Sequence, residues 1–112
     1  MRDTRQLVTD LDALRTYLFT DRAVIDAIGA ISDIPLRHKV LGARMDFYTA
    51  VDRLINVQLA SIADAFEQLE PALRAGMAAV RAKAEDLQRA ADAIAVAAAI
   101  AGLAASIASM LL

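Results

Sequence analysis

Residues 40–69 read VLGARMDFYTAVDRLINVQLASIADAFEQL and carry the most regular apolar pattern in the chain. Nine positions follow one another in alternating steps of four and three residues, the spacing that places side chains on one face of an α-helix. Only Asp52 among them is charged. The nine positions are Leu41, Met45, Tyr48, Asp52, Ile55, Leu59, Ile62, Phe66 and Leu69. This segment therefore predicts a long central helix that ends or kinks at Glu70–Pro71.

The flanking segments show the same helical spacing. Before residue 40, the apolar positions are Leu7, Leu11, Leu14, Leu18, Val24, Ile25, Ile28 and Ile31. Thr20 is a plausible N-cap where this pattern has a possible break, and Pro35 stops it. After Pro71, which fits the first turn of a helix, the pattern restarts and runs to the C-terminus. Apolar and polar residues never alternate as they do in a strand.

These segments predict an all-α fold. Helices of about 30, 34 and 40 residues would measure roughly 45, 51 and 60 Å at 1.5 Å per residue. Short connections between them predict an elongated antiparallel bundle of three long helices, or of four if the first helix breaks at Thr20. In either case the last helix outruns the others, and its C-terminal half is apolar and alanine-rich.

The charges divide the 112-residue chain into two unlike parts. All 26 Asp, Glu, Lys and Arg residues lie between Arg2 and Asp92, whereas residues 93–112 contain none. We therefore expect an amphipathic bundle over 1–92 and an apolar extension over 93–112, continuous with the last bundle helix. About 20 uncharged residues are enough to cross the ~30 Å core of a bilayer.

Two functions compete for this extension. The first hypothesis is a self-associating protein that inserts the extension into membrane lipid, either as a tail anchor or as an oligomeric pore element. The bundle would then lie on the cytoplasmic side, because the basic residues Arg81, Lys83 and Arg89 precede the extension. The alternative is a cytoplasmic, soluble homo-oligomer or protein-binding module, of structural, chaperone-like or immunity type, with the same helix as its assembly core. The residues assigned to membrane or assembly contacts are Ala98, Ile100, Gly102, Leu103, Ser106 and Ile107.

Asp52 interrupts the apolar face of the central helix, where an unpaired carboxylate would be costly to bury. One interpretation is that it pairs with an arginine of a neighbouring helix, Arg15 or Arg22, and fixes the register of the bundle. The other interpretation is that Asp52, Arg44 and Gln58 line the lumen of an oligomer.

Residues suited to catalysis are scarce. The chain has no cysteine, its one histidine, His38, stands between Arg37 and Lys39, and no Glu-x-x-His pair suggests a metal site. Isolated glycines do not form a phosphate-binding loop. With 12 basic and 14 acidic residues, the chain lacks the basic excess of a nucleic-acid-binding protein. We expect no enzymatic activity, no metal or cofactor and no nucleic-acid partner.

Overall fold

The computed structural model describes residues 4–57, 59–87 and 90–111, and these residues form helices and turns without any strand. Within these three ranges, five α-helices and one short 3₁₀ helix follow one another. They are α1 (Thr4–Thr20), α2 (Arg22–Gly29), α3 (Ile34–Ile55), η1 (Leu59–Ile62), α4 (Ala63–Glu85) and α5 (Ala90–Met110). The predicted all-α class is confirmed.

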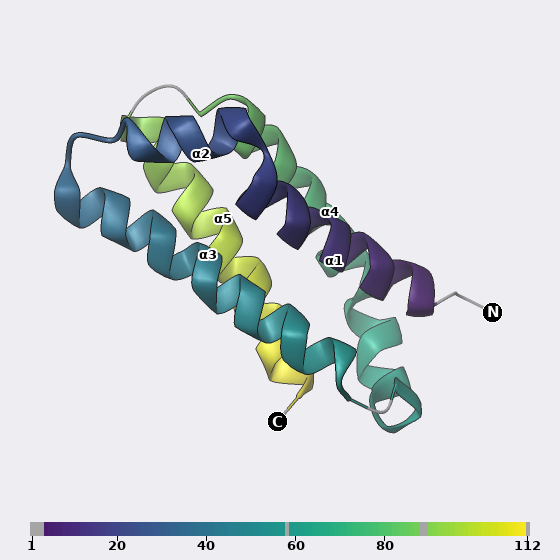
Figure 1. The fold of residues 1–112 in the computed structure, drawn as a ribbon. Coiled ribbons are helices and arrows are strands. Elements are labelled where there is room, and N and C mark those ends of the chain that lie inside the picture. Colours follow the sequence, from purple (N-terminus) through teal and green to yellow (C-terminus); the bar gives the residue numbers. More distant parts are fainter. Residues whose placement is uncertain (1–3, 58, 88–89, 112) are drawn as a thin grey trace.

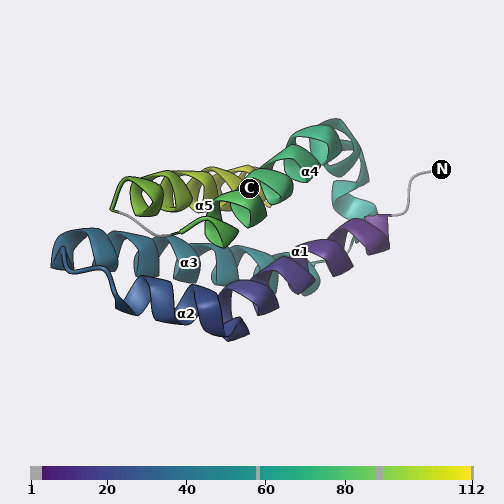
Figure 2. The same cartoon turned by 90° about the horizontal axis from the view of Figure 1, so that it is seen from above.

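The helices lie in two layers. Helices α1, α2 and α3 form one layer, and α4 and α5 form the other (Figure 2). Helix α5 packs most extensively against α3 and then against α4. It runs parallel to α3 and antiparallel to α4 (Figure 1). The principal extents are 44 × 22 × 20 Å, so the molecule is a compact five-helix fold and not the longer three-helix bundle expected from the sequence.

Two aspartates start helices, Asp21 at α2 and Asp33 at α3. The Asp21 carboxylate accepts the backbone N–H of Val24 at 3.2 Å, and the Asp33 carboxylate accepts that of Leu36 at 3.0 Å. Each satisfies an N–H group that the first turn of the helix leaves without a partner. The expected break after Thr20 exists, but its N-cap is Asp21. The turn expected before Pro35 is also present, with Pro35 in the first turn of α3.

The central helix does not run from residue 40 to 69 as expected. Helix α3 ends at Ile55, where the Asn56 side chain donates to the Asp52 carbonyl oxygen at 2.8 Å. Asparagine competes for backbone groups in this way and so favours helix ends. Pro71, the expected end, lies inside α4 on its exposed side. Water can there reach the carbonyl group that proline leaves without an N–H donor.

The apolar extension is also arranged differently from the expectation. Helix α4 ends at Glu85, followed by a turn at Asp86, and a separate helix begins at Ala90. Because α5 turns back along α4, it lies against the bundle and does not project beyond it (Figure 1). Its inner side is buried in the core at Val96, Ile100, Leu103, Ile107 and Met110.

Candidate functional site

The outer side of α5 exposes small and apolar side chains to solvent. We call it the α5 face, and its exposed residues are Ile94, Ala98, Ala101, Gly102, Ala105 and Ser109. None of them is charged, and only Ile94, which is 53 % exposed, is large. The face lies between α3 on one side and α4 on the other.

The residues that we assigned to membrane or assembly contacts fall on both sides of α5. Ile100, Leu103 and Ile107 are buried in the core. Ala98 and Gly102 lie on the α5 face, and Ser106, at its border, donates its hydroxyl hydrogen to the Gly102 carbonyl oxygen at 3.1 Å. The six assigned residues therefore include both core positions and exposed positions of α5.

A groove separates the α5 face from α3. Its volume is about 330 Å³, and α5 contributes only alanine to it: Ala101, Ala104, Ala105 and Ala108. The α3 side contributes Asp46, Thr49, Ala50 and Arg53. Asp46 and Arg53 were not among the residues assigned to a site from the sequence. Their seven-residue spacing, which places them on one side of a helix, was the signal that could have identified them.

A second groove, of about 300 Å³, separates the α5 face from α4. Its α4 border consists of Ala72, Gly76 and Ala79. A Cβ atom at Gly76 would lie 3.1 Å from Leu103 Cδ1, so glycine permits close packing of the two helices there. A Cβ atom at Gly102 would meet no atom within 4 Å. Within a single chain, therefore, no neighbouring atom requires glycine at position 102.

Two of the polar residues expected at a seam or lumen, Asp52 and Arg44, lie between α1 and α3, where Asp52 is near Arg15 as one interpretation expected. Asp52 is not buried, because its side chain is 59 % exposed, and its Oδ1 atom lies 3.9 Å from Arg15 Nη1. Arg44 donates to the Leu18 carbonyl oxygen at 3.2 Å, and its guanidinium lies 4.2 Å from the centre of the Phe19 ring. Burial lowers the pKa of Arg44. Gln58, the third member of the proposed lumen, lies outside the described residues.

Arg15, Phe19, Arg44 and Tyr48 form a continuous ladder between α1 and α3. The Phe19 and Tyr48 rings meet edge to face at 5.3 Å, and the Arg15 guanidinium lies 4.7 Å from the centre of the Tyr48 ring. Arg15 also pairs with Asp12 on its own helix. Cation–π and aromatic contacts of this kind stabilise helix packing, so we interpret the ladder as structural.

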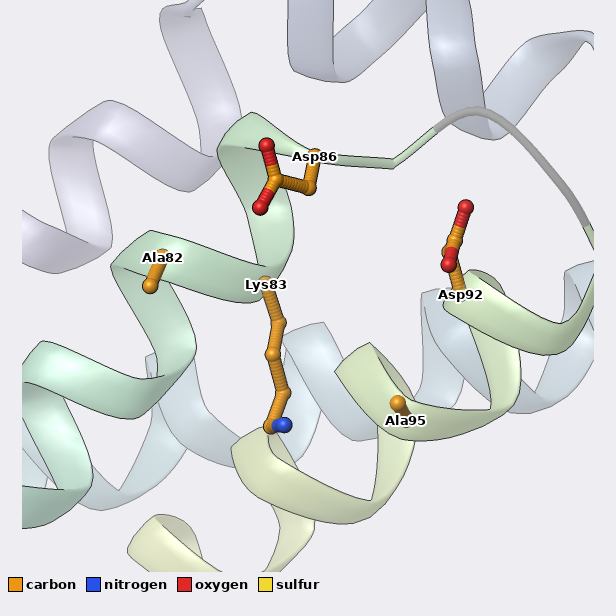
Figure 3. A pocket seen from close by; sticks show the side chains of 5 residues that line it. All are labelled: Ala82, Lys83, Asp86, Asp92 and Ala95. Carbon is orange, nitrogen blue, oxygen red and sulfur yellow. The ribbon is translucent and has the colours of Figure 1, made fainter.

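Two further pockets contain charged groups. The pocket between α4 and α5 is lined by Ala82, Lys83, Asp86, Asp92 and Ala95, and its three charged groups point in different directions (Figure 3). The other lies beside Tyr17, where Arg81 stacks at 4.2 Å from the ring centre. Burial, followed by the charges of Asp21 and Glu85, raises the pKa of Tyr17.

Among the described residues, no group of three or more His, Asp and Glu side chains could hold a metal ion. His38 is exposed near the start of α3. Comparison with protein-family models, curated proteins and solved structures found no match.

Proposed function

We propose that this protein is a non-enzymatic helical module that works as a soluble homo-oligomer and assembles through the α5 face. The observation behind the proposal is a charge-free surface of small side chains, bordered by two grooves, in a chain with 23 % charged residues. Small side chains let two helix backbones approach closely, and covering apolar surface favours association.

The role of α5 in the core supports a soluble assembly. One C-terminal helix, Asp92–Met110, is long and apolar enough to cross a membrane. Of its most apolar stretch of 18 residues, 44 % is buried within the protein. If α5 moved into lipid, its own side chains would stay out of water. The buried side chains of α3 and α4 would lose their cover, at a cost of about 1.5–3 kcal/mol for each large one.

That cost exceeds what insertion supplies. Seven Leu, Ile and Val residues at roughly −0.3 to −0.6 kcal/mol each give a gross drive of about −2 to −4 kcal/mol. If the departure of α5 exposed only three large buried side chains of α3 and α4, such as Phe47, Leu54 and Leu73, the cost would be about 5–9 kcal/mol. The energy difference favours a folded, soluble chain with α5 in place.

The proposal is tested by substitution of Gly102 with leucine. Open space surrounds this position within one chain, so Gly102→Leu should leave the fold intact but obstruct close approach of another copy. We expect the particle mass, measured by sedimentation without detergent, to fall toward that of one chain. Gly29→Leu is the matched control, since a Cβ atom at Gly29 also meets nothing within 4 Å. An oligomer that tolerates Gly102→Leu would contradict the proposal.

Membrane insertion of α5 is the second candidate, because its length and composition suit a membrane span. It requires α5 to leave α4. An ideal Cβ atom at Gly76 would lie 3.9 Å from Leu103 Cβ, a separation that suits a disulfide, and the chain has no native cysteine.

A Gly76→Cys/Leu103→Cys variant can therefore lock α5 in the core when oxidised. Under the insertion hypothesis, only the reduced form should bind phosphatidylcholine vesicles in a flotation assay. Under our proposal, neither form binds vesicles and the oxidised form still self-associates. Vesicle binding by the reduced form alone would favour insertion.

A further inference from the structure

The border of α3 next to the α5 face carries two charges of opposite sign. Asp46 and Arg53 both line the groove between α3 and α5, and both residues are exposed. Seven residues separate them, about 10 Å along the helix, which is beyond the three- or four-residue spacing of pairs within one helix. Within the described part of the chain, neither residue takes part in an ion pair or a side-chain hydrogen bond.

We propose that the partner on this face is a second copy of the chain, related by a two-fold axis that passes between Asp46 and Arg53. In this arrangement the two α3 helices run antiparallel, and Asp46 of each copy faces Arg53 of the other. Two identical ion pairs then fix the register of a dimer. This inference rests on the proposed function, to which it adds the two-fold geometry and the two residues that fix its register.

The two-fold arrangement follows from the distribution of charge. A contact between identical surfaces must be self-complementary, and one acidic and one basic group on either side of an axis satisfy that condition. Thr49 and Ala50 lie near the proposed axis, and α5 adds only alanine to this groove. No bulky or charged side chain of the groove opposes close approach at the centre.

A parallel arrangement fits these charges less well. It would place α3 of one copy over the α4 border of the other, which consists of Ala72, Gly76 and Ala79. Asp46 and Arg53 would then be removed from water without a partner, which is costly. Charge complementarity thus selects the antiparallel dimer.

The size of the surface is sufficient. The long faces of the molecule measure 44 Å by about 20 Å. A dimer that used most of such a face would cover close to the ~800 Å² per partner of a standard protein interface.

Reversal of the two charges tests the proposal, because a folding defect could not explain association that the complementary reversal restores. In a dimer of Asp46→Arg, or in one of Arg53→Asp, both ion pairs become pairs of like charges. Each variant should therefore associate at least about tenfold more weakly. In a mixture of the two variants, one copy carries two arginines and the other two aspartates. The mixture should therefore form heterodimers, and the double variant Asp46→Arg/Arg53→Asp should form homodimers again.

Glu67→Arg and Arg22→Asp, the latter on α2, are controls for the change in net charge. Both positions are exposed and neither lines the grooves beside the α5 face, so both variants should dimerise normally. If the unsubstituted chain is monomeric, the proposed function itself fails. If it dimerises but neither the mixture nor the double variant restores association, the two-fold register is wrong and the proposed function stands.

Discussion

Neighbouring residues of α5 have opposite environments. Ile100 is 1 % exposed, whereas Ala101, the next residue, lies on the α5 face. The sequence shows an apolar residue at both positions, and since every position from 93 to 112 is uncharged, no charged residue marks the outer side of the helix. Which of the six assigned residues face the core could therefore not be predicted from their identities. Only the packing of α3 and α4 against α5 distinguishes them.

Aspartate at these two positions should have different effects. Ile100→Asp places a carboxylate in the core and should lower the free energy of unfolding by at least about 3 kcal/mol. Ala101→Asp should lower the stability of the isolated fold by less than about 1 kcal/mol, the cost of helix propensity, while it weakens self-association. Urea unfolding and sedimentation measure the two effects. Equal destabilisation by both substitutions would mean that Ala101 is not on an outer face.

Alanine substitutions at Gly42 and Gly76 should distinguish the effect of helix propensity on stability from the effect of packing. Alanine is favoured over glycine in a helix by about 0.8–1 kcal/mol. Gly42→Ala should gain this amount because no atom lies within 4 Å of the new Cβ, whereas Gly76→Ala should gain less or lose stability against Leu103 Cδ1 at 3.1 Å. Thermal unfolding of the two variants checks the difference. A larger gain at Gly76 would contradict the close packing of α4 on α5.

At the scale of elements, the sequence predicted helices well and their ends poorly. Proline was expected to end the central helix at residue 71, but α4 continues through it, and the real break follows Asn56. The apolar spacing continues across this break. Periodicity alone therefore could not reveal that the chain turns there, and the same holds for the turn at Asp86.

The start of α3 depends on its cap. Asp33→Ala removes the acceptor of the Leu36 N–H group and should lower the free energy of unfolding by about 1 kcal/mol, while Asp33→Ser should cost much less because serine also caps. Chemical denaturation of both variants measures this. If serine were as harmful as alanine, the carboxylate would act through something other than capping.

The packing of α4 beside α1 should make stability sensitive to alkaline pH. The pKa of Tyr17 is raised from 10.0 in the folded chain, first by burial and then by Asp21 and Glu85. The Tyr17 hydroxyl of the unfolded chain therefore loses its proton at a lower pH than that of the folded chain. The stabilisation is complete below about pH 10 and is lost as pH rises through the folded pKa. Tyr17→Phe should show a shallower alkaline loss in urea midpoint, with Tyr48→Phe as control, and an unchanged slope would contradict this.

At the scale of the whole molecule, α5, which was expected to project as an apolar extension, is part of the core of the fold. The sequence suggested that residues 1–92 could stand alone as a bundle, but removal of 93–112 would take away most of α5, against which α3 and α4 pack. We expect the truncated chain to lose the cooperative unfolding transition of the full chain. A folded, monomeric 1–92 fragment in circular dichroism and sedimentation would contradict the central position of α5.

Self-association in water is the claim on which the account depends. Sedimentation equilibrium of the unsubstituted chain, over a wide concentration range and without detergent, tests it most directly. We expect a reversible species with a multiple of the 12.0 kDa chain mass, and twice that mass if the two-fold pairing is correct. A single 12.0 kDa species at every concentration would contradict the account.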